Sequence, residues 1–241
     1  MSWRQRGNLW CLWPERPLGL VEFIGGSYLA ATPQLSYRRL LEALAAQGLA
    51  VHAWSYVPGF DHQEQATRAW KEFRQERRRL PSPGLEPALR LGHSLGCKLH
   101  LLAPDNGRSC SGLAAVSFNN FSAERSVPLL AEVGQGLGFR SEFCPSPQET
   151  LRLVAGTYLQ PRNLLVRFHS DNLDQTPKLL EALRSRSGDR TELLELPGDH
   201  LTPASAGLRR QLLGRWANDA DRSRPIGLLA RTISSWGFSK G

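Results

Sequence analysis

A five-residue motif, Gly92-His93-Ser94-Leu95-Gly96, lies near the middle of the chain between an apolar run and a helix-like run that begins at Lys98. This context places the motif at a strand-to-helix junction. A turn this sharp strains the serine backbone and brings its neighbours two positions away nearly into contact, which favours glycine at both places. The motif is therefore typical of a nucleophile elbow, which would present the Ser94 hydroxyl at the edge of a sheet, above a helix N-terminus.

A serine hydroxyl is a weak nucleophile at neutral pH, so it needs a general base and an acid that orients the base. Residues 193–196 resemble a late strand, and the loop after them carries His200, which we predict to be the base. Residues 163–169 resemble the preceding buried strand, and its exit loop carries Asp171 and Asp174. We favour Asp174 as the acid because it lies a few residues beyond the strand and just before the next helix. Asp171 is the alternative acid, and is otherwise a turn residue.

Stabilisation of an oxyanion requires two backbone N–H groups that point to one place. Leu95, directly after the serine, is predicted to supply the first. An early strand ends in a glycine pair before Ser27, and we expect Gly26 or Ser27 to supply the second N–H. Ile24 stands where a histidine often precedes the glycines of lipase-type loops, but this difference removes no N–H group.

These residues resemble those of the α/β-hydrolases over nearly the full length of the chain. More closely, the sequence is similar to a branch found in cyanobacteria and plastids that is catalogued as domain of unknown function 1350. The resemblance implies a hydrolase fold and esterase-like chemistry, without a defined substrate. The stretches that carry it are Phe23-Ile24-Gly25-Gly26-Ser27, Gly59-Phe60-Asp61-His62, Gly92-His93-Ser94-Leu95-Gly96-Cys97-Lys98, Ser117-Phe118-Asn119-Asn120 and Gly198-Asp199-His200-Leu201-Thr202-Pro203.

Strand-like and helix-like segments alternate along the chain, which predicts an α/β fold with a mostly parallel sheet and helices on both faces. We expect one domain over residues 1–241, with two N-terminal strands before the first helix and a third strand at 49–54. Asp61 is expected to cap the next helix together with Glu64. Arg90 and Arg167 fall inside strands predicted to be buried, so each needs a charged partner or an edge.

Residues 119–161 exceed what one crossover helix requires, and we interpret them as a short helical lid insertion or as a crossover packed on the sheet. Gly134, Gly136 and Gly138 would be hinges of a lid, and Ser146 with Glu149 is expected to cap a helix within it. The glycine-rich run does not follow a strand as dinucleotide binding requires. We therefore predict no cofactor.

The composition fits a cytoplasmic protein. A hydrophobic content of 41% is ordinary, and no apolar run approaches the length of a membrane span or a signal peptide. The four cysteines are scattered without Cys-x-x-Cys spacing, which indicates reduced thiols and no zinc site, so no metal is predicted.

The formal net charge of +8 raises nucleic acid as a partner. The basic residues are dispersed, however, and the densest cluster, Arg74 with residues 77–79, is interpreted as the solvated face of a helix, so nucleic-acid binding is not expected. In the C-terminal tail, residues 221–241, Ile226, Leu229, Ile233 and Trp236 recur at helical spacing beside basic residues. We favour a helix packed on the domain, with peripheral membrane contact as the alternative. The sequence does not define the oligomeric state.

Two further polar pairs follow strand ends. Asp61-His62 is interpreted as a cap followed by an exposed histidine, and Asn119-Asn120 as loop residues, although either pair could bind substrate. The leading hypothesis is a serine hydrolase that cleaves a small-molecule acyl or carboxylic ester through a Ser-His-Asp triad and an acyl-enzyme intermediate. A non-catalytic binding or regulatory protein of the same fold is the alternative, and an acyltransferase or thioesterase with the same triad is a third hypothesis.

Overall fold

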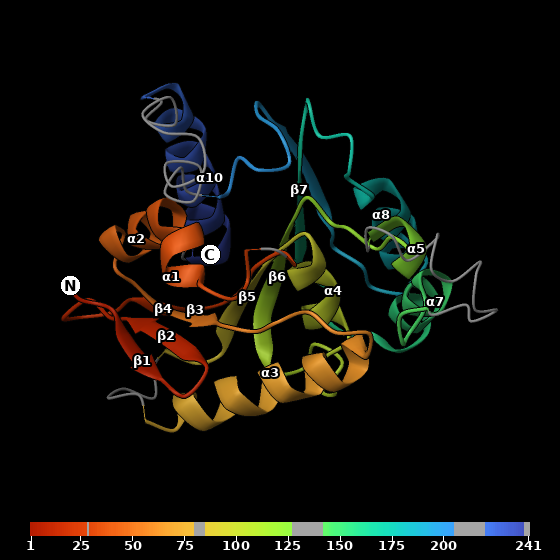
Figure 1. Cartoon of the computed structure of the whole chain (residues 1–241), viewed down its shortest axis with the longest axis horizontal. Helices are drawn as coiled ribbons and strands as arrows, with labels where there is room; N and C mark the ends of the chain where they lie inside the picture. Colours follow the sequence, from red (N-terminus) through yellow and green to blue (C-terminus); the bar gives the residue numbers. More distant parts are fainter. Residues whose placement is uncertain (28, 80–84, 127–141, 205–219, 239–241) are drawn as a thin grey trace.

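The computed structural model describes residues 1–27, 29–79, 85–126, 142–204 and 220–238. These residues form an eight-stranded sheet with helices on both faces, as predicted (Figure 1). The strand order is β1-β2-β4-β3-β5-β6-β7-β8. The strands are β1 (Arg4–Arg6), β2 (Leu9–Leu12), β3 (Gly19–Ile24), β4 (Leu49–Trp54), β5 (Ala88–His93), β6 (Cys110–Val116), β7 (Asn163–Phe168) and β8 (Glu192–Leu196).

The sheet is parallel from β4 through to β8, whereas β1 pairs antiparallel with β2 and β2 antiparallel with β4. Three strands, not the expected two, precede the first helix, because residues 4–12 form an edge hairpin of their own. The central strands β3, β4 and β5 are buried along their whole length. Since the carboxyl ends of parallel strands meet at one edge of a sheet, the loops after β3, β5, β7 and β8 lie close together.

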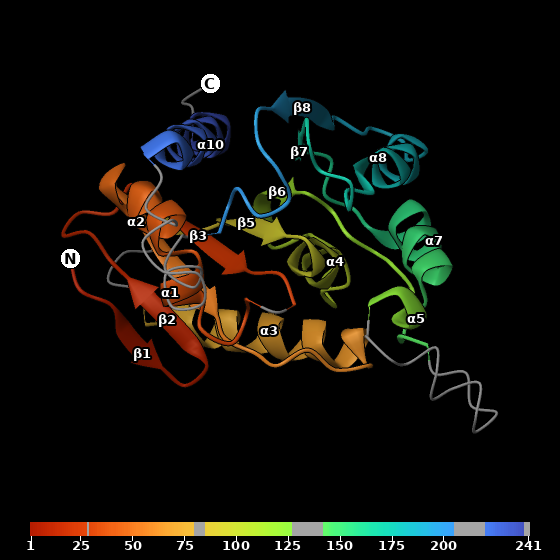
Figure 2. The same ribbon diagram turned by 45° about the horizontal axis from the view of Figure 1, so that its top comes forward.

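The helices form two layers (Figure 2). One layer packs the apolar side chains of α2 and α10 against the sheet, and the other packs those of α3, α4, α7 and α8. Among the described helices, none combines the length and apolar character needed to cross a membrane. The helices are α1 (Pro33–Ser36), α2 (Arg38–Ala46), α3 (His62–Arg77), α4 (Leu95–Leu101), α5 (Ala123–Ser126), α7 (Pro147–Thr157), α8 (Thr176–Arg184) and α10 (Ala220–Phe238).

Both predicted helix caps are confirmed. The Asp61 carboxylate accepts a hydrogen bond from the Glu64 N–H at 2.7 Å, which begins α3. Ser146 and Glu149 form a reciprocal capping box at the start of α7. Of the segment interpreted as a lid, α5 and α7 are described, whereas the three predicted hinge glycines at 134, 136 and 138 lie outside the described residues.

The buried arginines obtain charged partners. Arg90 on β5 is 1% exposed, and one of its guanidinium nitrogens lies 2.8 and 2.9 Å from the two carboxylate oxygens of Asp105. Arg77 pairs with Glu22 on β3 through two hydrogen bonds. The interpretation of residues 77–79 as a wholly solvated face is therefore wrong at Arg77, because this side chain is buried. Its positive charge compensates the buried Glu22 carboxylate.

The C-terminal helix packs onto the domain, as favoured from the sequence. Ile226, Leu229 and Ile233 of α10 are buried in the cluster that also contains α2, and the Trp236 indole donates to Glu192 at 2.7 Å. The apolar residues that membrane contact through this tail would need are therefore covered by the protein itself.

Candidate active site

The turn between β5 and α4 has the geometry predicted for a nucleophile elbow. Ser94 has φ +55° and ψ −122°, a strained conformation for a residue with a side chain. A Cβ atom on Gly96 would lie 2.0 Å from the Ile24 carbonyl oxygen, and one on Gly92 would lie 2.6 Å from the Cys97 Cα. Glycine is thus required at both positions by close backbone approach, and the turn holds Ser94 at the N-terminus of α4.

Three side chains from different loops form one hydrogen-bonded chain. His200, after β8, places its Nε2 3.1 Å from the Ser94 Oγ. Its Nδ1 lies 2.9 and 3.0 Å from the two carboxylate oxygens of Asp171, which follows β7. Burial opposes ionisation of Asp171, but hydrogen bonds from His200 and other groups outweigh it and hold the pKa of this carboxyl below its usual value. An ionised Asp171 fixes the Nδ1–H tautomer of His200, which leaves Nε2 free to accept the serine proton.

The preference for Asp174 as the acid is wrong in the structure. Its Oδ1 accepts hydrogen bonds from the N–H and the hydroxyl of Thr176, at the start of α8. Its Oδ2 lies 3.5 Å from Nε of Arg167, a strand residue that needs a charged partner. Asp174 therefore stabilises a helix start and neutralises Arg167, while Asp171 takes the position beside His200.

The loop that carries His200 is held by its own hydrogen bonds. The Thr202 hydroxyl accepts from the Asp199 N–H at 2.8 Å, and the Thr202 N–H donates to the Asp199 carbonyl at 2.9 Å. Gly198, with φ +139°, supplies the backbone conformation that starts this turn. The imidazole is thereby presented from a short, internally bonded loop.

Of the predicted oxyanion donors, the structure separates Gly26 from Ser27. The Gly26 N–H donates to the Tyr37 hydroxyl at 2.8 Å and is therefore already engaged. Ser27 and Leu95, in contrast, both line one cavity of the protein. A Cβ atom on Gly26 would lie 3.0 Å from the Ser94 Cβ, so this glycine lets the loop approach the elbow closely.

His93, the variable residue of the motif, joins the loops of this site. The Tyr37 hydroxyl lies 2.8 Å from His93 Nδ1, and His93 Nε2 lies 2.8 Å from the His200 carbonyl oxygen. Because the His200 carbonyl can only accept, His93 carries its proton on Nε2 and donates to it. Nδ1 of the neutral ring then accepts from the Tyr37 hydroxyl, which itself accepts from Gly26. Burial lowers the pKa of His93 to about 3, so the ring is neutral and this tautomer is consistent. The sequence pattern alone does not indicate this role of His93.

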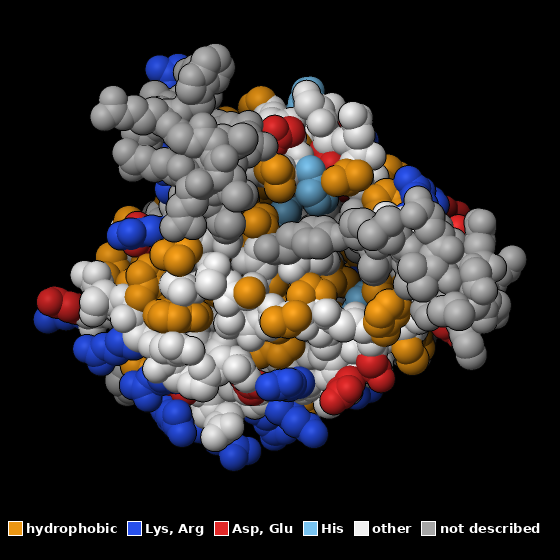
Figure 3. Space-filling model, in the orientation of Figure 1, with side chains coloured by type: hydrophobic (Ala, Val, Ile, Leu, Met, Phe, Trp, Pro, Cys, Tyr) orange, Lys and Arg blue, Asp and Glu red, His pale blue; other side chains and the backbone are white. Residues whose placement is uncertain are grey.

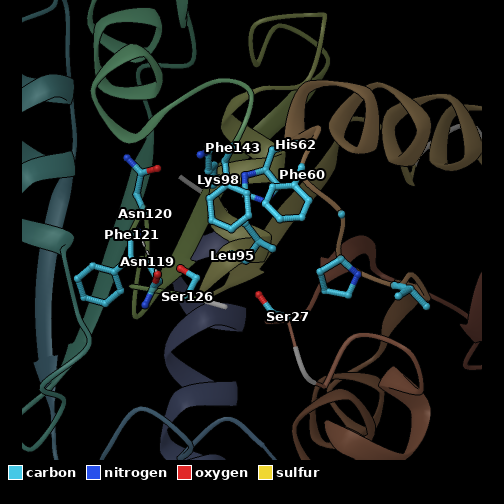
Figure 4. Close-up of a pocket in the computed structure, with 13 residues that line it drawn as sticks. Ser27, Phe60, His62, Leu95, Lys98, Asn119, Asn120, Phe121, Ser126 and Phe143 are labelled. Carbon is cyan, nitrogen blue, oxygen red and sulfur yellow. Dashed lines mark hydrogen bonds between the residues drawn. The ribbon is translucent and has the colours of Figure 1, made fainter. Parts of the chain in front are cut away.

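Hydrophobic side chains gather toward the middle of the face of the molecule shown in Figure 3. A mainly apolar cavity of about 380 Å³ is lined by Ser27 and by Leu95, the residue after Ser94 (Figure 4). Figure 4 shows side chains from several loops and from α3 and α4 around it. Its lining residues are Ser27, Val57, Pro58, Gly59, Phe60, His62, Leu95, Lys98, Asn119, Asn120, Phe121, Ser126 and Phe143.

The cavity includes both polar pairs that the sequence left open. His62 is 2% exposed and stacks on the Phe143 ring at 4.3 Å, so its interpretation as an exposed histidine is wrong. Phe143 comes from the segment before α7, and no local pattern predicts this contact. The Asn120 side-chain amide donates to the Pro147 carbonyl at 2.8 Å. Its Oδ1 accepts no hydrogen bond among the described residues.

The sequence matches a family described as "Protein of unknown function (DUF1350)" over residues 2–220. The chain belongs to this family. Among curated proteins, none matches the sequence. Membership of DUF1350 confirms the resemblance seen in the motifs of the sequence.

Solved structures show the fold of this DUF1350 protein. A monoacylglycerol lipase of Paleococcus ferrophilus is similar at a TM-score of 0.64, with 14% identity over 99% of each chain. An esterase of Thermogutta terrifontis with bound butyrate is similar at 0.61, with 16% identity over 97% of this chain and 91% of that one. The thioesterase domain of the curacin biosynthetic pathway has a TM-score of 0.55, with 14% identity over 88% of this chain and 97% of that one. The protein therefore has an α/β-hydrolase fold.

Proposed function

We propose that this protein is a serine hydrolase that cleaves carboxylic esters through an acyl-enzyme intermediate. The observation that supports this most directly is the hydrogen-bonded chain from Ser94 Oγ through His200 to Asp171. A buried strand-to-helix turn holds the serine in a strained conformation, a cost that a purely structural serine would not require.

In the proposed reaction the Ser94 oxygen attacks the ester carbonyl while His200 Nε2 takes the hydroxyl proton. Asp171 stabilises the imidazolium that forms. The backbone N–H groups of Leu95 and Ser27 bind the oxyanion, since Gly26 is engaged by Tyr37. His200 then returns the proton to the leaving alcohol, and water, activated by His200, releases the acid from Ser94.

The apolar cavity supports an acyl or ester substrate as the partner. Leu95 and Ser27, the proposed oxyanion donors, are among its lining residues, so an acyl chain attached to the bound carbonyl would enter the cavity directly. One of the structurally similar esterases holds butyrate, a short acyl product. Cys11, Cys97, Cys110 and Cys144 are free thiols, as is common for proteins of a reducing compartment, which supports the cytoplasm as the proposed location.

A fluorophosphonate probe tests the proposal because it labels only an activated serine. We expect labelling of the wild type, hydrolysis of p-nitrophenyl butyrate, and loss of both in Ser94→Ala. Ser185→Ala, an exposed serine at the end of α8, serves as the matched control and should behave as the wild type. An unlabelled wild type without esterase activity would favour the alternative of a non-catalytic binding protein. A Ser94→Ala variant as active as the wild type would refute Ser94 as the nucleophile.

The same groups would also cleave a thioester or transfer the acyl group to an acceptor other than water. The similarity to a thioesterase domain is the observation that keeps this second function open. Butyryl thioester and butyryl ester, compared at equal concentration, distinguish the two substrate classes through the ratio of their kcat/KM values. An added alcohol that diverts the acyl product would indicate transfer.

A further inference from the structure

One side of the cavity carries a buried cation that the proposed reaction does not use. Lys98 lies on α4 and is 1% exposed. Figure 4 shows it beside Phe143 and His62 at the cavity wall. Burying an ammonium group costs several kcal/mol unless it is paired, so its presence here calls for a partner.

The described residues leave Lys98 without an anionic partner. Its ammonium donates to the Pro145 carbonyl at 2.9 Å and lies 5.8 Å from the centre of the Phe143 ring. No carboxylate in the described part of the chain lies within ion-pair distance of it. Glu142, an acidic group nearby, is engaged by the backbone N–H groups of Ala123 and Phe143. Among the residues that the structure describes, two of the three ammonium protons thus have no acceptor.

Lys98 nevertheless keeps its charge at neutral pH. Burial lowers the pKa of Lys98 to about 8, and the acidic side chains around it oppose that shift. A pKa of about 8 leaves most of the population protonated at pH 7.

His62 adds an unused donor beside this cation. Its ring lines the cavity and stacks on Phe143, and neither ring nitrogen has a hydrogen-bond partner among the described residues. Burial and the nearby Lys98 charge lower the pKa of His62 to about 3, so the ring is neutral. A neutral imidazole still carries one N–H, which makes His62 a second donor next to the ammonium.

Resting on the proposed hydrolase function, we propose that the cavity binds an acyl chain that ends in a carboxylate, with Lys98 and His62 as the donors to that carboxylate. Val57, Phe60 and Phe143 also line the cavity, and their apolar side chains suit the methylene groups of such a chain. Lys98 follows Ser94 by four residues, about one helical turn or ~6 Å along the axis, so the chain is short. The substrate class is therefore a half-ester of a short dicarboxylic acid.

The test compares two substrates of equal chain length that differ in this terminal group: the mono-p-nitrophenyl ester of adipate and p-nitrophenyl hexanoate. The measured quantity is the ratio of their kcat/KM values. We expect the wild type to prefer the half-ester, and Lys98→Met to lower the ratio by about tenfold or more, the effect of a hydrogen bond to a charged group. Lys71→Met removes the same charge from the exposed face of α3 and should keep the wild-type ratio.

A purely structural role for Lys98, as an anchor for the Pro145 carbonyl, makes a different prediction. It would lower the melting temperature and both kcat/KM values together, without changing their ratio. His62→Phe, which retains a ring against Phe143 and lacks the N–H, gives an independent reading and should also lower the ratio. A wild type that favours the hexanoate, or an unchanged ratio in both folded variants, overturns the proposal.

Binding separates this inference from the proposed hydrolysis. Calorimetry on Ser94→Ala should show tighter binding of monomethyl adipate than of methyl hexanoate, and the added Lys98→Met change should remove the difference. If the wild type hydrolyses no ester and this binding preference persists, the hydrolase function fails while the carboxylate site stands. If esters are hydrolysed and no preference appears in rates or binding, the carboxylate site fails alone.

Discussion

Replacing Asp171 by asparagine should nearly abolish turnover while leaving the protein folded. In the wild type both carboxylate oxygens lie about 3 Å from Nδ1 of His200, so either can accept its proton. An asparagine has only one such oxygen, and its amide group can instead donate to Nδ1. That donation favours the tautomer with the proton on Nε2, which then points at the Ser94 oxygen and cannot accept its proton.

The size of the effect follows from this loss of the base. A triad acid that loses its charge typically lowers kcat by about 10⁴-fold, which equals about 5 kcal/mol of transition-state stabilisation. Asp174→Asn should change kcat by less than about tenfold, because its carboxylate contacts Thr176 and Arg167 and not the imidazole. It should instead lower the stability by about 1 kcal/mol, as expected for a lost interaction at a helix start.

The assay measures kcat on p-nitrophenyl butyrate, normalised to the fraction of protein that is folded by circular dichroism, with melting temperatures for both variants. We expect Asp171→Asn to lose activity with little loss of stability, and Asp174→Asn to lose stability with little loss of activity. The reasoning is refuted if Asp174→Asn shows the larger loss of kcat, since among the described residues no contact joins Asp174 to His200.

Three other predictions concern groups around the site and in the core. Tyr37→Phe removes a hydroxyl that serves two buried partners, so it should lower the melting temperature and kcat together, measured by calorimetry and ester hydrolysis. Asp105→Asn leaves the buried Arg90 charge unpaired and should cost about 3–5 kcal/mol in urea unfolding, against less than about 1 kcal/mol for Arg38→Gln in an exposed ion pair. The pKa of Asp105 is lowered to about 2 despite burial, chiefly by Arg90, so the wild type should lose this stabilisation as the pH falls from about 4 through about 2. The variant should lose less stability than the wild type over this pH range. Ile233→Asp on α10 should destabilise the fold by about 3 kcal/mol or more in the same unfolding assay, whereas a helix that served only to bind membranes would tolerate it.

The parts of the site that the sequence could predict are those that depend on local geometry. Glycine is required at positions 92 and 96 because a side chain there would collide with the backbone of Cys97 and of Ile24, the last residue of β3, respectively. His200 follows from a strand and a short turn whose pattern is visible in the chain. The mostly parallel order of strands follows from their alternation with helices.

The sequence favoured Asp174 over Asp171 because two aspartates share one loop, and the choice between them depends on their distant neighbours. Asp174 lies 3.5 Å from Arg167, a half-buried residue that also lies 3.8 Å from Glu195. Asp171 instead contacts His200, which is 29 residues away in the chain. Local pattern does not distinguish these two environments.

The burial of His62 and the hydrogen bond from the Gly26 N–H depend on contacts with residues of other secondary-structure elements. His62 is covered by Phe143, and Gly26 is bonded to Tyr37 at the junction of α1 and α2. Neither residue type nor spacing indicates these pairs. Contacts of side chains that fill the space between loops are decided by the tertiary packing, which is why these two contacts could not be predicted from the sequence.

The hydrogen bonds through His93 give the site a property that none of its loops has alone. The hydrogen bonds all point in one direction: the Gly26 N–H donates to Tyr37, the Tyr37 hydroxyl donates to His93, and His93 donates to the His200 carbonyl. Each group in this series has its donor and acceptor roles filled, and the neutral state of His93 permits only one arrangement. The series therefore joins the loop that carries Ser27 to the loop that carries His200. A displacement of either loop breaks a buried hydrogen bond, so the same residues fix the position of the Ser27 backbone relative to the His200 imidazole.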